Sequence, residues 1–257
     1  MRLTVLGSSA SYAGPGEACA GYLVEGGGAR VLFDCGNGVL AKLARVANPL
    51  TLDAVFITHG HPDHFVDLYA LQALLRYAPE GPAPALPLWA PNGLFERMQA
   101  LLSDRGRIEL YEAFECSELI AGEPVRVRDL TVTPRPVEHT EPTFALVAEA
   151  DGVRLCYTAD TAPTEGVVAA ARDADLLLAE ATLPDAYAGR APHLTAAQAG
   201  ALARDADVSA LVLTHVWPTN DRSAMVVDAA AEFDGPVSVA SEYAMYEVRP
   251  ARHRKGS

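Results

Sequence analysis

The sequence is poor in cysteine and holds no long apolar run, and each shortage excludes a class of protein. It has four cysteines in 257 residues, and no two of them form a C-x-x-C pair. We therefore do not expect a zinc knuckle built from cysteines. Free thiols are typical of the reducing cytoplasm, where we expect the protein to work. No segment approaches the roughly 18 apolar residues that span a bilayer, and the apolar run at residues 3–6 is too short for a signal peptide.

Positive charge is also scarce. Lys and Arg total 20 against 33 Asp and Glu, for a formal net charge of −13. Extended binding to nucleic acid relies on cations that neutralise phosphates, so we do not expect it here. The basic tail formed by Arg249, Arg252, Arg254 and Lys255 is typical of a solvated terminus.

The hydrophobic half of the composition is enough for a sizeable core, and no linker or repeat divides the chain. We therefore predict one domain over residues 1–257. Apolar runs and turn residues predict strands at 3–6, 21–25, 30–34, 53–58, 88–90, 108–114, 125–127, 130–134, 144–149, 153–158, 176–179, 210–214 and 237–239. Helices are predicted at 39–46, 68–77, 91–102, 165–172, 195–205 (with Thr195 as N-cap) and 223–233. This pattern favours two sheets packed face to face with helices outside.

Three of the seven histidines lie in His59-Gly60-His61-Pro62-Asp63-His64, directly after the predicted buried strand 53–58. Imidazole and carboxylate are the ligands that zinc prefers when cysteine is absent. A loop held by a rigid sheet is a common place for such ligands. The alternative is a solvated turn that is rich in histidine, but the density and the setting of the cluster favour a metal site.

Three further residues share this placement, just beyond the end of an apolar strand: His139, Asp160 and His215. Taken singly, such a histidine is more often a surface or core residue than a ligand. Together with the cluster, the three indicate a single metal centre.

This pattern resembles the metallo-β-lactamase superfamily over essentially the whole chain. The resemblance includes Asp34-Cys35-Gly36-Asn37-Gly38 and Thr158-Ala159-Asp160-Thr161. It implies an α/β (α+β) four-layer αββα sandwich with two metals in a cleft between the sheet edges. By this resemblance His59, His61 and His139 hold the first metal, Asp63, His64 and His215 hold the second, and Asp160 bridges them. These nitrogen and carboxylate donors suit two divalent ions. Zinc is the expected metal, and manganese and iron are the alternatives.

The β-lactamases commonly place a cysteine where Asp160 stands, so the chain looks more like the ribonuclease Z-like phosphodiesterase branch. The resemblance implies attack by a metal-bridging hydroxide that Asp63 orients. The segment from Glu180-Ala181-Thr182 to His193-Leu194-Thr195 is similar to one in that branch whose histidine binds phosphate and donates a proton. His193 is thus the expected proton donor, although it could simply precede a helix. Glu180 and Asp34 are expected to support the ligands through hydrogen bonds, and Asp34 could equally cap a turn.

Two features favour a small substrate. Bacterial ribonuclease Z-like enzymes carry a long arm between the third histidine and the bridging aspartate, whereas the predicted hairpin 144–158 nearly fills that interval here. The C-terminal segment 232–248 is similar to that of actinobacterial relatives that hydrolyse cyclic nucleotides. That family often has His-Leu-His-Ala-Asp-His, and Gly60 and Pro62 replace its spacers here. We expect a phosphodiesterase for a small diester such as a 3′,5′-cyclic nucleotide.

Three alternatives stay open at this point: a tRNA 3′-processing endonuclease, a lactone or thioester hydrolase, and a non-catalytic metal-binding protein. The intact set of seven ligands speaks against the last. The expected partner is a small-molecule phosphodiester, and we expect no association with a membrane. A homodimer is possible in solution, because related enzymes are often dimers.

Overall fold

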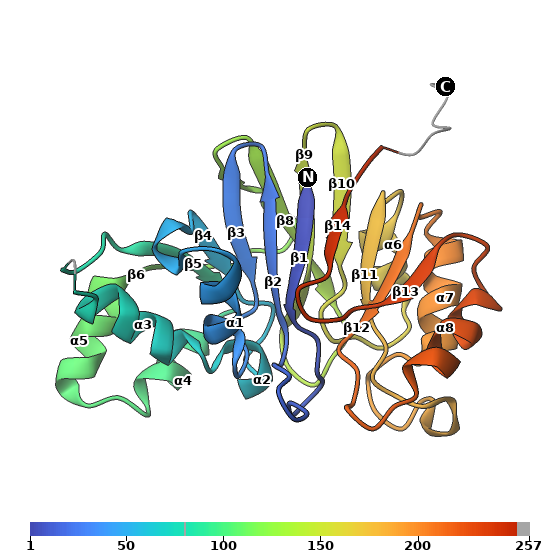
Figure 1. Ribbon diagram of the computed structural model, residues 1–257, viewed down its shortest axis with the longest axis horizontal. Coiled ribbons are helices and arrows are strands. Elements are labelled where there is room, and N and C mark those ends of the chain that lie inside the picture. The colour runs from blue at the N-terminus through green and yellow to red at the C-terminus, as the bar shows by residue number, and fades with distance from the viewer. Residues whose placement is uncertain (80, 251–257) are drawn as a thin grey trace.

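The computed structural model describes residues 1–79 and 81–250, so Arg252, Arg254 and Lys255 of the predicted basic tail lie outside it. Two seven-stranded sheets lie face to face at the centre (Figure 1). The first has the order β14-β1-β2-β3-β4-β5-β6, and the second the order β13-β12-β11-β10-β9-β8-β7.

The first sheet consists of β1 (Arg2–Gly7), β2 (Gly21–Gly26), β3 (Ala29–Phe33), β4 (Ala54–Phe56), β5 (Leu86–Ala90), β6 (Phe114–Glu118) and β14 (Met245–Glu247). The second consists of β7 (Val125–Val127), β8 (Leu130–Val137), β9 (Thr143–Ala150), β10 (Val153–Tyr157), β11 (Leu176–Glu180), β12 (Leu211–Thr214) and β13 (Val237–Val239). Each sheet has an antiparallel half and a parallel half. The parallel half is β3 to β6 in the first sheet and β10 to β13 in the second.

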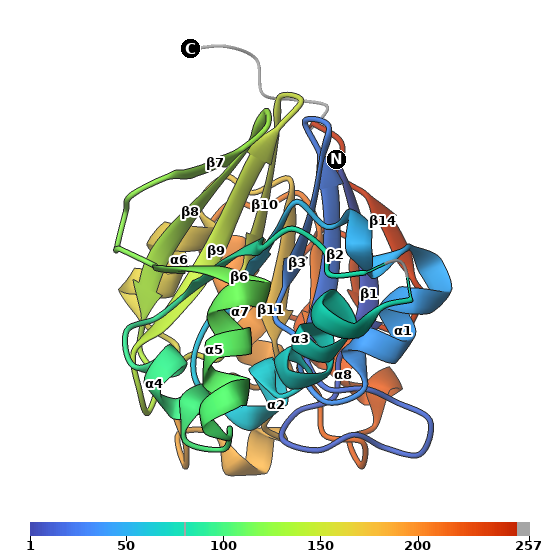
Figure 2. The same cartoon turned by 90° about the vertical axis from the view of Figure 1, so that its left-hand side faces the viewer.

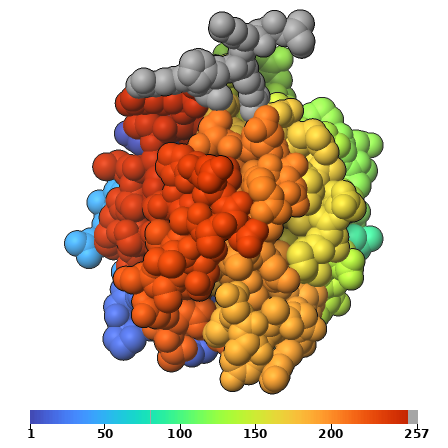
Figure 3. All heavy atoms as spheres, turned by 90° about the vertical axis from the view of Figure 1, so that its right-hand side faces the viewer, coloured from blue at the N-terminus to red at the C-terminus, as the bar shows by residue number. Residues whose placement is uncertain are grey.

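Helices cover the outer face of each sheet. The first sheet carries α1 (Val39–Val46), α3 (Leu68–Tyr77), α4 (Leu94–Gln99) and α5 (Asp104–Ala113), and the short α2 (Pro62–Phe65) lies at its edge (Figure 2). The second sheet carries α6 (Glu165–Ala171), α7 (Ala196–Asp205) and α8 (Arg222–Ala230), whose side of the molecule faces the viewer in Figure 3. The expected four-layer αββα sandwich is thus confirmed. Two short 3₁₀ helices lie at Pro49–Thr51 and Asp185–Tyr187.

Three apolar clusters hold these layers together. The central one lies between the sheets, where Tyr22, Phe33 and Phe56 of the first sheet share a buried layer with Leu146 and Tyr157 of the second. Each fully buried side chain of this size contributes roughly 1.5–3 kcal/mol relative to exposure. The other two clusters lie under the helices of each outer layer, so both faces of both sheets are covered.

One predicted element is wrong. Residues 108–114 were expected to form a strand because Ile108, Tyr111 and Phe114 favour β-structure, but α5 extends to Ala113 and β6 begins at Phe114. The Ser103 hydroxyl caps this helix by accepting the Gly106 N–H at 3.2 Å. Burial follows the three-residue spacing of a helix, while Ile108 and Tyr111 are exposed.

Other differences concern element ends and short elements. β5 starts at Leu86 rather than 88, α4 spans only Leu94–Gln99, and neither α2 nor β14 was expected. The predicted cap of α7 is confirmed, because Thr195 and Gln198 form a reciprocal capping box. Among the described residues, no helix has both the length and the apolar character needed to cross a membrane.

The strand directions decide where the polar loops meet. β3 and β4 run parallel, as do β10, β11 and β12, and β8 has the same direction as β10 because two antiparallel pairings relate them. The carboxyl ends of these strands therefore lie at one end of the sandwich, opposite the hairpin tips (Figure 1). Ligand sites in sheets with parallel strands gather at such ends.

Candidate metal centre

The loop that carries the histidine cluster leaves β4 and enters α2 at Pro62, where proline suits the first helical turn. Its position is set by the neighbouring Asp34–Gly38 segment. The Cys35 N–H donates to the His64 carbonyl at 2.7 Å. A Cβ on Gly36 would lie 1.9 Å from the Asp63 carbonyl oxygen, so this close approach of two backbones requires glycine.

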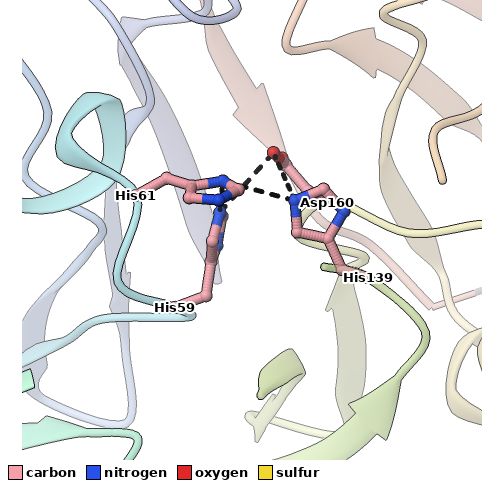
Figure 4. Close-up of side chains that lie close together, drawn as sticks. All are labelled: His59, His61, His139 and Asp160. Atoms are coloured by element: carbon pink, nitrogen blue, oxygen red, sulfur yellow. Dashed lines mark hydrogen bonds and ion pairs between the residues drawn. The ribbon is translucent and has the colours of Figure 1, made fainter. Parts of the chain in front are cut away.

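The first group of predicted ligands is compact (Figure 4). His59 Nε2 lies 3.0 Å from His61 Nδ1, which in turn lies 3.3 Å from His139 Nε2. Asp160 Oδ2 lies 3.6 Å from His59 Nε2 and 3.8 Å from His139 Nε2. Four donor atoms from β4, β8 and β10 loop ends therefore converge on one point.

The second group lies next to the first. His64 Nε2 is 3.1 Å from His215 Nε2, and Asp63 Oδ2 is 3.3 Å from the same His215 atom. The other oxygen of Asp160, Oδ1, lies 3.4 Å from His64 Nε2. The two oxygens of Asp160 thus face different groups, which is the arrangement expected of a bridging carboxylate.

Both groups fit divalent cations. Asp160 Oδ1 is buried and has no hydrogen-bond partner among the residues that the structure describes, whereas buried polar atoms are normally satisfied. Burial lowers the pKa of His59 and of His139, which favours the neutral imidazole that binds metal. Six of the seven donors come from side chains that are at most 12 % exposed, namely His59, Asp63, His64, His139, Asp160 and His215.

Asp34 lies next to the second ligand group. Its side chain is fully buried and accepts hydrogen bonds from the Thr58 N–H at 2.8 Å and the Tyr157 hydroxyl at 2.9 Å. Asp34 Oδ2 also lies 2.7 Å from His64 Nδ1. A carboxylate at Nδ1 holds the proton there and leaves Nε2 free to face a metal.

Glu180 holds two further residues in place. Its Oε1 lies 2.9 Å from His193 Nδ1 and accepts the Thr161 N–H at 2.7 Å. Its Oε2 accepts the Thr182 hydroxyl, and that hydroxyl lies 2.8 Å from His215 Nδ1. The fully buried carboxylate therefore orients both the expected proton donor and one predicted ligand.

His193 lies between the two groups. The centre of its ring is 4.9 Å from that of His139 and 5.8 Å from that of His215. Burial lowers the pKa of His193, but the hydrogen bond and the charge of Glu180 outweigh it and raise the pKa to about 9. The Glu180 carboxylate thus favours the protonated imidazole, which can donate a proton.

Sequence reasoning missed several residues of this site. The Ser11 N–H donates to Asp63 Oδ2 at 2.7 Å, and Ser11 adopts a left-handed conformation, with φ of 61°, to do so. Glu141 and Arg97 lie beside His61. No spacing or motif marks these residues, because each contact joins distant segments of the chain.

Comparison with known proteins identifies the family of this chain. The profile of the β-lactamase superfamily domain matches residues 29–216. An uncharacterized protein of Mycobacterium tuberculosis is 35 % identical over 262 residues, which cover 98 % of this chain and 93 % of that protein. A protein of Myxococcus xanthus named ribonuclease Z is 30 % identical over 302 residues, covering 93 % of this chain and 95 % of its own.

Among solved structures, the metallo-β-lactamase fold protein YhfI from Bacillus subtilis superposes with a TM-score of 0.85 at 26 % identity, over 95 % of this chain and 98 % of its own. The matched profile covers well over half of the chain, and the two seven-stranded sheets with their outer helices have the same architecture. The chain therefore belongs to the β-lactamase superfamily and is a hydrolase of the metallo-β-lactamase fold.

Proposed function

We propose that this hydrolase is a two-metal phosphodiesterase whose substrate is a small diester such as a 3′,5′-cyclic nucleotide. The observation that carries the proposal is the pair of neighbouring ligand groups, toward which the two oxygens of Asp160 face separately, with His193 beside both. Two cations beside a protonated imidazole match the needs of phosphoryl transfer, in which charge spreads over several oxygens.

In this proposal two divalent ions, with zinc as the first choice, would be held by the seven predicted ligands. His59, His61 and His139 would hold one ion, Asp63, His64 and His215 would hold the other, and Asp160 lies between the two groups. Nitrogen and carboxylate donors suit zinc. Such ions supply Lewis acidity and lower the pKa of water when bound.

The protein's own side chains then orient the attacking group and protonate the leaving group. Asp63, which the Ser11 N–H holds in place, accepts a hydrogen bond from the attacking hydroxide ion and aims it at phosphorus. His193 donates its proton to the leaving alkoxide oxygen, since an alkoxide is a poor leaving group without one. Glu180 orients the His193 ring and favours its protonated form before this step.

The small size of the substrate is supported by charge and by chain length. A net charge of −13 opposes a large polyanion. Between His139 and Asp160 the chain forms the β9–β10 hairpin of the second sheet and leaves no residues for an added arm. The relative named ribonuclease Z keeps tRNA processing as the alternative that the experiment must distinguish.

The test is a substrate panel for zinc-loaded protein: 3′,5′-cAMP, 3′,5′-cGMP, a 2′,3′-cyclic nucleotide, a pre-tRNA and an acyl lactone, with products separated by chromatography. We expect hydrolysis of a cyclic nucleotide, abolished by Asp160→Asn. Cleavage of pre-tRNA alone, or of the lactone alone, would overturn the proposal.

A further inference from the structure

His61 differs from the other four histidines of the centre in its exposure. Its side chain is 38 % exposed, whereas those of His59, His64, His139 and His215 are at most 1 % exposed. Close packing fixes the orientation of a buried ring. An exposed ring keeps the freedom to rotate unless hydrogen bonds hold it. The orientation of the His61 ring therefore depends on its hydrogen-bonding contacts more than the orientation of the buried rings does.

The outer nitrogen of His61 faces a carboxylate. Glu141 Oε1 lies 3.2 Å from His61 Nε2, and the Thr140 hydroxyl oxygen lies 3.2 Å from the same atom. The inner nitrogen, Nδ1, points at His59 and His139. A carboxylate at Nε2 holds the proton there, so the lone pair of the neutral ring is left on Nδ1.

Arg97 fixes Glu141 in turn. Arg97 Nη2 donates to Glu141 Oε2 at 2.9 Å, and Arg97 Nη1 is 3.4 Å from Glu141 Oε1. This two-point pairing matches the fork of the guanidinium to the carboxylate. Arg97 belongs to α4 on the first sheet, and Glu141 lies between β8 and β9 of the second, so the pair joins the two halves across the centre.

The same guanidinium also holds the backbone between the first two histidines. Arg97 Nη1 donates to the Gly60 carbonyl. A Cβ at position 60 would lie 2.6 Å from Arg97 Nη1 and 3.2 Å from Glu141 Oε2. The glycine spacer therefore makes room for the ion pair to lie against the loop.

We propose that Arg97 and Glu141 are positioning residues for His61: they hold its ring so that Nδ1 faces the first metal site. Glu141 sets the tautomer and the orientation of the ring, and Arg97 fixes both Glu141 and the loop. The inference rests on the two-metal centre and is independent of which bond the enzyme cleaves.

The test measures metal binding without any substrate. Metal-free wild type and the variants Glu141→Ala and Arg97→Ala are titrated with Zn²⁺ and with Co²⁺, whose absorption spectrum reports its coordination. We expect affinity for one of the two ions to fall about 10- to 100-fold, with an altered Co²⁺ spectrum, while the second ion binds as in wild type. Glu141→Gln retains an acceptor oxygen and should recover part of the loss.

The matched control is Glu112→Ala, which breaks another partly exposed ion pair: Arg76 Nη2 on α3 lies 2.7 Å from Glu112 Oε2 on α5. It should bind both ions as wild type does. Thermal unfolding of the metal-free variants shows whether each is folded. Wild-type affinities and an unchanged Co²⁺ spectrum in both alanine variants would overturn the proposal, as would an equal loss in the Glu112→Ala control.

Discussion

Asp34 Oδ2 lies 2.7 Å from His64 Nδ1, although 30 positions separate the two residues in the chain. The same carboxylate accepts hydrogen bonds from Thr58 and Tyr157 and is shielded from solvent. It therefore holds a predicted metal ligand in a single orientation within the interior.

Replacing Asp34 should weaken the second metal site. An amide in Asp34→Asn lacks the charge and the acceptor capacity to serve the Thr58 N–H, the Tyr157 hydroxyl and the His64 ring together. We expect metal affinity to fall about 10- to 100-fold, measured by titration of the metal-free variant with zinc. Tyr157→Phe removes one hydrogen bond but keeps the carboxylate, so its effect should be much smaller. Equal losses in the two variants would argue against this role of Asp34.

The role of His193 predicts a dependence on the leaving group. In His193→Ala, kcat should fall about 10²- to 10⁴-fold for a diester with an alkoxide leaving group. A p-nitrophenyl diester should be much less affected, because p-nitrophenolate leaves without a proton. Steady-state kinetics with both substrates measure the ratio, and Glu180→Gln should show a weaker form of the same selectivity. A uniform loss on both substrates would refute proton donation by His193.

Gly36 should not tolerate a side chain. The methyl group of Gly36→Ala would collide with the Asp63 carbonyl oxygen, and relief requires movement of the metal-site loop. We expect a loss of stability of about 1–3 kcal/mol or more in urea unfolding, together with weaker metal binding. Gly166→Ala in α6 is the matched control, since the nearest atom to its added Cβ lies at 3.6 Å. That variant should be at least as stable as wild type, and similar losses in both would contradict the prediction.

Glu25 should make stability depend on pH. Burial raises the pKa of its carboxyl, but the hydrogen bonds and charges of Arg2 and Arg30 outweigh this and lower the pKa in the folded protein. Its stabilisation is therefore complete above the unfolded pKa of about 4.3 and is lost as the pH falls through the folded value. Glu25→Gln should be less stable by about 0.5 kcal/mol at pH 7, as for partly exposed pairs, and equal to wild type in strong acid. Denaturation series at several pH values measure this difference, and one that stays constant with pH would contradict the prediction.

Much of the fold could be predicted from local patterns. The strands of the hairpin at Gly26–Gly28 and the helix over residues 68–77 lie where apolar spacing and turn residues place them. Residues 108–114 misled the prediction because β-favouring side chains stand on a helix whose buried face is set by contacts with the sheet. Strand β14 was missed because its three residues pair with β1, at the other end of the chain.

The sequence by itself determined which residues could bind metal. His59, His61, Asp63, His64, His139, Asp160 and His215 follow apolar strands, and the direction of a strand places the residue after it at a definite edge of the sheet. Only the tertiary structure decided which atom of each residue faces the centre. The partners that set the tautomers, such as Asp34 for His64 and Glu141 with Arg97 for His61, come from distant segments. Hydrogen bonds act over about 3 Å, so such partners become visible only when folding has brought the two sheets together.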